Sequence, residues 1–313
     1  MSNAVDVDRL VKRYGGTTAL EAISFSVGAG ALFGFIGPDG AGKTTLFRIL
    51  ATLLVPDAGA ARVFGLDVVT NLRPLRSRIG YMPGRFSLYP DLSVEENLRF
   101  FASVFGTTPE RERDQIAPIY SQLEPFKERR AAALSGGMKQ KLALCCALVH
   151  RPDILLLDEP TTGVDAVSRR EFWDLLGRLK QSGLTIVVST PYMDEANRCD
   201  RVALIQHGRI LAIDAPQAIT RSFGGTLFAV RVDDRYRALL TLRKYPQTAT
   251  TYPFGDTLHF TDARRDAGDE LIIRELTAHL RAEGFPEASV EAIPATVEDV
   301  FMSRMGEPEG ATS

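Results

Sequence analysis

The 313-residue sequence lacks any hydrophobic run long enough to cross a membrane. Its apolar runs, such as Ile154–Leu157 and Ile186–Val188, fall far short of the roughly 20 residues that a transmembrane helix needs. The first residues, Met1–Asp6, contain neither a basic segment nor an apolar core, so we expect no signal peptide. These absences favour a globular protein over a membrane-spanning one.

Cysteine is scarce, and a strong charge of one sign is missing. The three cysteines are Cys145, Cys146 and Cys199, of which two are adjacent, a poor geometry for a disulfide. Because no metal-binding spacing such as C-x-x-C occurs, we expect them to be buried packing residues in a reducing cytoplasm. The formal net charge of −2 provides no basic field, so we do not expect nucleic acid as the main partner.

What is present is organised around one glycine-rich stretch. The apolar segment Ala31–Ile36 before it indicates a buried strand, and Thr44–Leu54 has the apolar spacing of a helix. The stretch itself is Gly37, Pro38, Asp39, Gly40, Ala41, Gly42, Lys43 and Thr44, with Thr45 following. A strand, such a loop and a helix are together typical of a phosphate-binding P-loop, and a chance glycine turn is the alternative.

The residue types in the P-loop fit the chemistry of a nucleoside triphosphate. Gly37, Gly40 and Gly42 allow successive backbone N–H groups to point at phosphate oxygens at a helix N-terminus. Lys43 would reach the β- and γ-phosphates, and the Thr44 hydroxyl would ligate Mg²⁺.

Two acidic residues follow the apolar strand Ile154–Leu157. Asp158 can hold Mg²⁺ through water, and Glu159 can polarise the attacking water as a general base. The two acids could be a structural accident, but the P-loop upstream favours a catalytic role. Glu159 and Lys43 are the predicted catalytic residues.

Ser135, Gly136 and Gly137 precede a helix predicted over Met138–Val149. Ser135 could simply cap this helix. A more specific interpretation is that the Ser135 hydroxyl and the glycine N–H groups grip a γ-phosphate. Since the chain already has its own P-loop, this second grip makes sense only against the nucleotide of another chain.

The order of predicted elements indicates an α/β fold with a mainly parallel sheet and an antiparallel addition at one side. Strands are predicted at residues 5–11, 23–27, 61–65, 79–83, 154–157, 184–189, 201–205 and 209–212, a turn at 12–16, and helices at 44–54, 138–149 and 169–181. Residues 85–134 form a predicted helical insertion, with a capping box at Ser93–Glu96 and a second helix that starts at Pro109.

A smaller C-terminal domain is predicted over residues 219–305, after a first domain of residues 1–218. Its order of strand, helix, strand, strand, helix and strand indicates a ferredoxin-like α+β unit. The polar tail, residues 306–313, is predicted to be disordered.

The P-loop, the stretch Leu134–Gln140 and the stretch Leu155–Pro160, in this order, closely resemble the ATP-binding subunits of ABC transporters. The resemblance covers residues of about 5 to 215 and implies ATP and Mg²⁺ as cofactors, and an ABC-ATPase fold with an antiparallel β subdomain. It also implies that two such domains meet head to tail, with ATP between the P-loop of one and Ser135–Gly137 of the other. Gly163–Asp165 would then cross the interface, and Tyr14 would stack on adenine unless it is only a surface aromatic.

Finer features resemble the ABC-2 type, which are mostly exporters. These features are Tyr81–Pro83, Phe86–Pro90, Asp194–Ala196 and a closing motif, Pro294–Phe301, of an accessory C-terminal domain. The resemblance implies membrane subunits as partners. The residues expected to contact them, which could instead be ordinary core residues, are Phe86, Leu88, Tyr89 and Leu92.

Two positions depart from the family pattern. Gly84 stands where the family has a glutamine that senses Mg²⁺ and water, and Pro191 stands where it has a histidine that holds the γ-phosphate. Neither residue can donate a side-chain hydrogen bond. Both positions serve the chain's own nucleotide, whereas Ser135, Gly136, Gly137 and Asp165 serve the partner's. The pattern therefore favours a heterodimer with one weak site, although a homodimer remains open.

The sequence predicts an ATP-hydrolysing subunit of an ABC-2 type exporter, peripheral on the cytoplasmic face of the cell membrane. Asp158 and Thr44 are the predicted metal-binding residues. One alternative is an ATP-binding, catalytically weak regulatory half of a heteromeric transporter. Another is a soluble ABC ATPase that acts on DNA or ribosomes, which the single cassette and the missing heptads disfavour.

Overall fold

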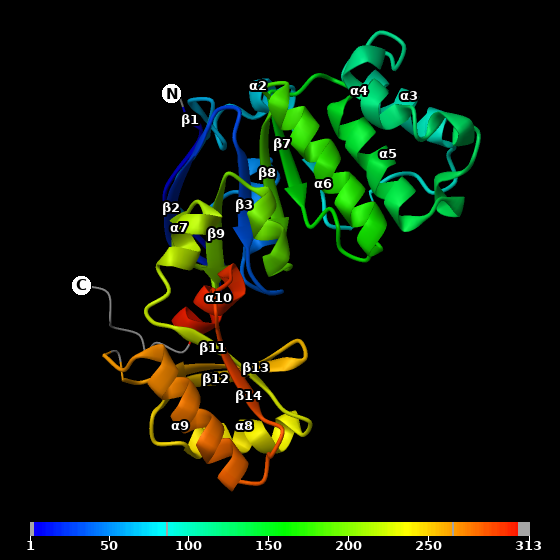
Figure 1. Cartoon of the computed structure of the whole chain (residues 1–313). Coiled ribbons are helices and arrows are strands. Elements are labelled where there is room, and N and C mark those ends of the chain that lie inside the picture. The colour runs from blue at the N-terminus through cyan, green and yellow to red at the C-terminus, as the bar shows by residue number, and fades with distance from the viewer. Residues whose placement is uncertain (1–2, 86, 265, 306–313) are drawn as a thin grey trace. The chain divides into compact units, whose positions relative to one another are not determined.

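The computed structural model describes residues 3–85, 87–264 and 266–305 (Figure 1). The chain forms two compact units that divide after Pro216, close to the boundary after residue 218 that the sequence predicts. The predicted contact residue Phe86 and the predicted disordered tail, residues 306–313, lie outside the described residues. Each unit is described by itself.

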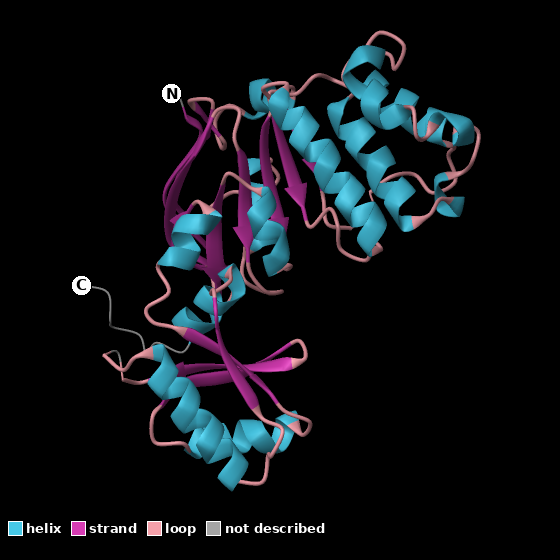
Figure 2. Ribbon diagram, in the orientation of Figure 1, coloured by secondary structure: helices cyan, strands magenta, loops and turns pink. Residues whose placement is uncertain are grey.

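The first unit is built on a six-stranded sheet whose order is β10-β9-β3-β8-β7-β6 (Figures 1 and 2). Its strands are β3 (Leu32–Ile36), β6 (Ile79–Met82), β7 (Ile154–Asp158), β8 (Thr185–Thr190), β9 (Arg201–Gln206) and β10 (Arg209–Asp214). Every pair is parallel except the edge hairpin of β9 and β10, as predicted. All residues of β3, β7 and β8 are buried, which explains the apolar run in each of these strands.

An antiparallel sheet of order β2-β1-β4-β5 accompanies it, as the predicted β subdomain. Its strands are β1 (Asn3–Tyr14), β2 (Thr17–Gly28), β4 (Ala58–Val63) and β5 (Leu66–Asp67). The predicted turn at residues 12–16 is wrong in its first part, because Lys12 pairs with Leu20 and Tyr14 with Thr17. Cross-strand pairing therefore extends the strand beyond its apolar residues, and only residues 15 and 16 turn.

Helix α1 (Lys43–Leu50) follows the P-loop and ends earlier than the predicted Leu54. Thr52 has a φ of 61°, outside the helical region, and Arg76 of α2 (Leu72–Arg76) donates hydrogen bonds to the Thr52 hydroxyl and carbonyl oxygens. A contact with a residue distant in sequence thus fixes a turn that the apolar spacing could not indicate.

The helical insertion contains α3 (Val94–Val104), α4 (Arg113–Tyr120) and two short 3-10 turns, and α5 (Gly136–Leu148) and α6 (Ala166–Gln181) lie beside it (Figure 2). The predicted capping box is confirmed: Glu96 N–H donates to the Ser93 hydroxyl, and Ser93 N–H donates to the Glu96 carboxylate. The helix start at Pro109 is wrong, since α4 begins at Arg113. A turn closed by Glu112, which accepts a hydrogen bond from the Thr107 hydroxyl, precedes it.

The second unit has the predicted ferredoxin-like order of elements. They are α7 (Pro216–Arg221), β11 (Leu227–Arg231), α8 (Arg235–Lys244), β12 (Thr248–Phe254), β13 (Thr257–Asp262), α9 (Asp269–Ala282), β14 (Ser289–Ile293) and α10 (Val297–Met305). The sheet order is β12-β13-β11-β14, and all pairs are antiparallel. Its core joins one face of the sheet, including Phe228 and Phe260, to α8 and α9.

Helix α10, which the sequence pattern does not predict, packs by its apolar residues Val297, Val300 and Phe301. Its Asp299 is fully buried and accepts hydrogen bonds from His259 Nδ1 at 2.6 Å and from the Tyr252 hydroxyl at 2.8 Å. His259 alternates with the core residue Phe260 along β13, so it lies on the other face of the sheet. The motif Pro294–Phe301 therefore holds α10 on that second face.

Among the residues that the structure describes, no helix combines the length and the apolar character that crossing a membrane requires. The three cysteines, all in the first unit, are buried and have free thiols, as predicted from their spacing. Burial raises the pKa of Cys145, Cys146 and Cys199, which makes these thiols unreactive at neutral pH.

Candidate nucleotide-binding site

The register of the parallel strands brings the predicted site residues to one edge of the six-stranded sheet. Ile36, the last residue of β3, pairs with Thr190 of β8, and Ser189 of β8 pairs with Asp158 of β7. The loops that follow these strands therefore leave from the same edge, which is where ligands bind in sheets of this kind. We call this the carboxyl edge; it comprises the loops that follow Ile36, Met82, Asp158 and Thr190.

Close backbone contacts explain the glycines of the P-loop. A Cβ atom at Gly37 would lie 2.0 Å from the carbonyl oxygen of Ile205, and one at Gly42 would lie 2.3 Å from that of Ala19. Gly42 also has a φ of 102°, and Gly40 has a φ of 79°, conformations that side chains disfavour. The loop thus depends on glycine for its conformation as well as for phosphate access.

Lys43 and Glu159, the two predicted catalytic residues, are in direct contact. Lys43 is 3% exposed, and its Nζ donates to the carbonyl oxygens of Gly37 at 2.7 Å and Pro38 at 2.9 Å. The same Nζ lies 3.1 Å from Glu159 Oε1. These contacts occupy the three N–H donors of the ammonium group. The lysine is thus folded back on its own loop and offsets the charge of the Glu159 carboxylate.

Ser189 positions both acidic residues, and sequence reasoning missed it. Its hydroxyl donates to Asp158 Oδ1 at 2.7 Å and accepts from the backbone N–H of Glu159 at 3.0 Å. Glu159 has a φ of 51°, which is uncommon for a non-glycine residue and is held here by hydrogen bonds to Ser189. A polar Ser-Thr pair at the end of the apolar strand β8 was the available signal.

The two departures from the family pattern lie at this edge. A Cβ atom at Gly84 would lie 3.1 Å from the carbonyl oxygen of Asp158 and 3.7 Å from its Oδ2, so Gly84 lies beside the predicted metal-binding carboxylate. Pro191 directly follows Thr190, whose carbonyl oxygen accepts a hydrogen bond from the N–H of Gly37.

Thr44 and Thr45 lie in the first turn of α1, and Ala41 is buried behind the loop. Asp39 is exposed at the tip of the P-loop. Tyr14, the predicted adenine contact, is 48% exposed at the end of β1, with Lys12 Nζ 5.8 Å from its ring centroid.

The residues predicted to serve a partner's nucleotide form a second group at the N-termini of α5 and α6. Ser135 caps α5 by accepting from the N–H of Met138 at 3.3 Å. Asp165 caps α6, and hydrogen bonds from Ser168 lower the pKa of its carboxyl group. A Cβ atom at Gly137 would lie 2.5 Å from the Ser168 hydroxyl, and one at Gly136 would lie 3.6 Å from the carbonyl oxygen of Gly163. The two stretches are therefore packed against each other.

The predicted partner-contact residues separate into different surroundings. Leu88 is 6% exposed and lines an apolar hollow of about 270 Å³, together with Phe101 and Val104 of α3. Tyr89 is 46% exposed and packs edge-on against Phe100 with ring centroids 4.7 Å apart. Leu92 is half-buried and lines a different, polar hollow.

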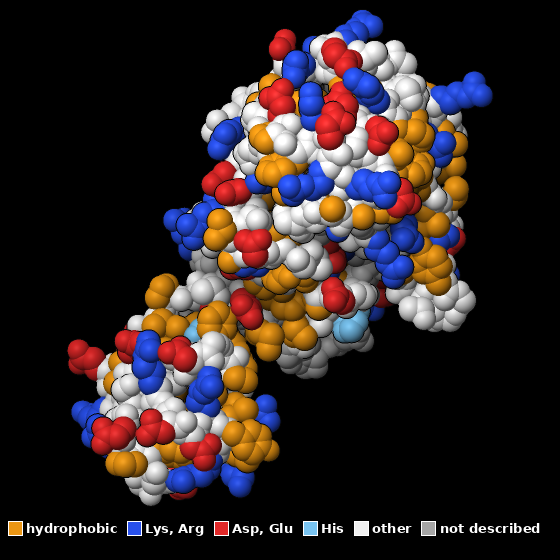
Figure 3. All heavy atoms as spheres, turned by 90° about the vertical axis from the view of Figure 1, so that its right-hand side faces the viewer, with side chains coloured by type: hydrophobic (Ala, Val, Ile, Leu, Met, Phe, Trp, Pro, Cys, Tyr) orange, Lys and Arg blue, Asp and Glu red, His pale blue; other side chains and the backbone are white. Residues whose placement is uncertain are grey.

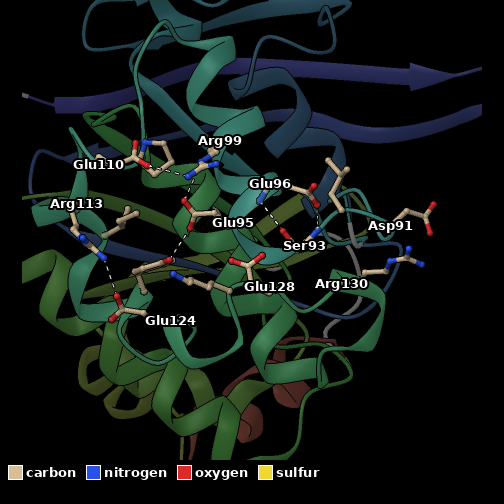
Figure 4. A pocket seen from close by; sticks show the side chains of 15 residues that line it. Asp91, Ser93, Glu95, Glu96, Arg99, Glu110, Arg113, Glu124, Glu128 and Arg130 are labelled. Carbon is tan, nitrogen blue, oxygen red and sulfur yellow. Dashed lines mark hydrogen bonds and ion pairs between the residues drawn. The ribbon is translucent and has the colours of Figure 1, made fainter.

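That polar hollow, about 660 Å³, lies on the helical insertion and is shown in Figure 4. Its acidic and basic side chains pair with one another, as in Arg99–Glu95 at 3.3 Å and Arg113–Glu124 at 2.9 Å. Figure 3 likewise shows basic and acidic side chains interspersed over this face of the molecule. Balanced charge of this kind is typical of a solvated surface rather than of a site for one charged ligand.

Known proteins whose sequences are similar to this chain belong to a family of nucleotide-binding proteins. A sequence profile described as "ABC transporter" matches residues 20–162. The chain is 38% identical over 313 residues to the probable multidrug ABC transporter ATP-binding protein YbhF of Escherichia coli, covering 98% of this chain and 53% of that protein. It therefore spans about half the length of that relative.

This chain covers a larger share of two further relatives. Nod factor export ATP-binding protein I of Ralstonia nicotianae is 36% identical over 306 residues, which cover 96% of this chain and 94% of that protein. The daunorubicin/doxorubicin resistance ATP-binding protein DrrA of Streptomyces peucetius is 38% identical over 236 residues, which cover 74% of this chain and 72% of that protein.

Solved structures share the fold of the first unit. CbiO1 of Clostridium perfringens, part of the ABC transporter complex CbiONQ, has a TM-score of 0.63 at 27% identity, covering 71% of this chain and 92% of its own. A dimeric ATP-binding cassette with bound ADP and phosphate has a TM-score of 0.60 at 25% identity, covering 67% of this chain and 98% of its own. With its P-loop and acidic pair at one sheet edge, the chain belongs to the ATP-binding proteins of the ABC transporter family.

Proposed function

We propose that the chain is the ATP-hydrolysing subunit of an ABC-2 type exporter and that it acts at the cytoplasmic face of the cell membrane. The observation that carries this proposal is the pairing of Lys43 with Glu159 at the carboxyl edge, where a γ-phosphate and its attacking water would meet. The names of the relatives, which refer to Nod factor export and drug resistance, support export as the direction.

ATP would rearrange the Lys43 contacts. The ammonium group now holds two P-loop carbonyl oxygens and the Glu159 carboxylate. Phosphate oxygens carry more negative charge than these carbonyl groups, so Lys43 turns to the β- and γ-phosphates. Glu159 is then free to accept the proton of the attacking water. As long as Lys43 pairs with the Glu159 carboxylate, it stabilises that carboxylate and opposes the proton transfer.

Thr44 and Asp158 fit a magnesium site, because a hydroxyl and a carboxylate are the hard oxygen ligands that Mg²⁺ prefers beside phosphates. Asp158 has Oδ1 fixed by Ser189 and Oδ2 facing the open position at Gly84. Bound Mg²⁺ would neutralise charge on the β- and γ-phosphates. Tyr14, exposed at the end of β1, would stack on the adenine ring.

A second ATPase chain completes the site in this proposal. The N-terminal turns of α5 and α6 present Ser135, Gly136, Gly137 and Asp165 on one packed surface. In a head-to-tail dimer this surface grips the partner's ATP through backbone N–H groups at a helix N-terminus. Dimer closure on ATP and reopening after hydrolysis would drive alternating access in the membrane subunits.

The membrane subunits would dock at the apolar hollow beside Leu88. It is lined by residues of β6, α3 and α5, and an apolar helix of a partner fits such a groove. Tyr89 and its neighbour Phe100, both partly exposed, extend the apolar surface next to it.

A second candidate function is an ATP-binding but catalytically weak half of a heteromeric transporter. Gly84 and Pro191 favour it, because both lie at the carboxyl edge and neither side chain can donate a hydrogen bond to water or phosphate. Losing such donors costs about 100- to 1,000-fold in turnover per group.

The test compares Mg·ATP turnover by the purified chain with that of Glu159→Gln, with nucleotide binding measured separately. Turnover in the wild type that Glu159→Gln abolishes is the expected result. ATP binding with no turnover would identify the chain as the weak half. Turnover that survives Glu159→Gln would refute the assigned general base.

A further inference from the structure

Glu195, on the short 3-10 helix Met193–Arg198 that follows β8, is a buried carboxylate to which the proposed mechanism assigns no role. It is 3% exposed. Its Oε1 accepts a hydrogen bond from the Thr161 hydroxyl at 3.0 Å, and its Oε2 accepts one from the Thr190 hydroxyl at 2.5 Å. Arg169 Nε lies 3.8 Å from Oε1. The charge is thus buried with two hydroxyl donors and one cation around it, which offsets the cost of desolvation.

The three partners belong to three different segments of the proposed catalytic machinery. Thr161 is two residues beyond the general base Glu159. Thr190 immediately precedes Pro191, and its carbonyl oxygen accepts the hydrogen bond from Gly37 of the P-loop. Arg169 lies in the first turn of α6, the helix that Asp165 caps.

Both hydroxyl partners are joined rigidly to the positions that they flank. Pro160, with its fixed φ, separates Thr161 from Glu159, so anchoring Thr161 limits where the general base can go. On the other loop, the N–H of Tyr192 donates to the Thr190 hydroxyl at 3.0 Å across Pro191. Arg169 in turn lies over the Tyr192 ring, 4.7 Å from its centroid. A displacement of Glu195 would therefore move both loops.

We propose that Glu195 is a positioning residue that holds the loop of Glu159 and the loop of Pro191 in one fixed geometry and ties both to α6. This proposal rests on the proposed ATP hydrolysis and adds a residue to it. Position 191 is a proline and cannot hold the γ-phosphate through a side-chain donor, so the hydrogen bond from Thr190 to Glu195 anchors this loop instead. Glu195 also connects the residues that serve the chain's own nucleotide with the helix that carries Asp165.

The chemistry favours a positioning role over plain stabilisation. Glu195, Thr161 and Thr190 are all at most 3% exposed, so apolar residues at all three positions would fill the same space without a charge to satisfy. Well-packed apolar residues commonly stabilise such a place as well as a buried ionic network does. A carboxylate with directional hydrogen bonds specifies the positions of its partners more narrowly than apolar contacts do.

The test uses the purified full chain with Glu195→Gln, which keeps the shape but places an amide N–H₂ where a carboxylate oxygen accepts. Amide hydrogen exchange is measured over residues 159–165 and 190–196, together with kcat and the KM for ATP. We expect faster exchange in both segments together, and a fall in kcat of about 10-fold or more with KM nearly unchanged.

Thr161→Val and Thr190→Val form a second test, because each removes one donor without changing the shape. We expect each to lower kcat, and the double variant to lower it less than the product of the two single effects, as in a shared network. Asp299→Asn is the matched control: it also alters a buried, hydrogen-bonded carboxylate, but in the second unit, and should leave kcat unchanged.

Unchanged exchange in both segments of Glu195→Gln, or unchanged kcat in the folded threonine variants, would overturn the proposal. A wild-type chain without turnover would count against the proposed hydrolysis instead. The exchange measurement would then still decide the role of Glu195, because it needs no catalysis.

Discussion

The two units each bury a carboxylate among polar side chains, and the comparison separates two uses of the same chemistry. Asp299 accepts from His259, Tyr252 and Thr296 and fastens a helix to the second face of a sheet. Glu195 accepts from two loop residues that flank the proposed catalytic positions at the carboxyl edge. The partners, rather than the burial, indicate what each carboxylate does.

The difference gives an expectation for each unit. Breaking the Asp299 network frees an element that touches no proposed substrate, so stability should fall and turnover should not. Breaking the network at the carboxyl edge shifts groups that must lie within hydrogen-bond reach of water and phosphate, so turnover should fall more than stability. Three changes, of which Asp299→Asn is already named as a control, test this comparison.

Ser189→Ala should have the largest effect on turnover. It removes the hydroxyl that holds Asp158 and the N–H of Glu159, so we expect kcat to fall by about 10- to 100-fold and the Mg²⁺ requirement to rise. The measurement is ATP turnover against Mg²⁺ concentration. Thr185→Val is the control, since it removes a buried hydroxyl from the other end of β8, where it accepts from the N–H of Gly30. If both variants lost turnover equally, the loss would reflect a lower stability of the first unit and not a specific role of Ser189.

Gly84→Gln combined with Pro191→His should have an intermediate effect: we expect turnover to rise several-fold, short of the about 100- to 1,000-fold that each donor contributes in ideal geometry. The double change restores two hydrogen-bond donors beside Asp158 and Thr190. A Cβ atom at position 84 meets the carbonyl oxygen of Asp158 at 3.1 Å, so a small backbone shift accompanies it. Steady-state turnover of the double variant beside both single variants measures the gain. No gain would mean that some other feature limits turnover at this edge.

Asp299→Asn should change turnover least while lowering stability by about 1–3 kcal/mol, the cost of an unsatisfied buried group. Burial alone would raise the pKa of Asp299, but hydrogen bonds from His259, Thr296 and Tyr252 outweigh burial and hold it below its ordinary value of 3.8. Because the pKa is lower in the folded state, this stabilisation is present above the unfolded pKa and is lost as the pH falls through the folded one. Denaturant unfolding at neutral and acidic pH measures it. A loss of turnover in folded Asp299→Asn would contradict the comparison.

Local sequence patterns predicted much of this protein correctly. Apolar runs marked β3, β7 and the centre of β8, because strands buried on both faces consist largely of apolar residues. The capping box at Ser93–Glu96 and the order of elements in the C-terminal unit were also predicted, because each depends on residues close together in the chain. The assigned roles of Tyr14 and of Ser135–Gly137 remain predictions.

Boundaries set by distant residues could not be predicted in this way. Arg76 ends α1 by binding Thr52, and a turn closed by Glu112 delays α4 beyond Pro109. The sequence pattern did not predict the helix α10 either, since its burial depends on hydrogen bonds that Asp299 accepts from two strands some 40 residues earlier.

The sequence by itself determined the P-loop, the acidic pair and the apolar strands that precede them, because these are contiguous motifs with a characteristic spacing. Only the tertiary structure decided that Lys43 pairs with Glu159, that Ser189 holds both acids and that Glu195 joins three segments. Except for Thr190 and Glu195, which are 5 positions apart, the hydrogen-bonded residues in these contacts lie 30 or more positions apart. The sheet register that creates these contacts is a property of the folded chain.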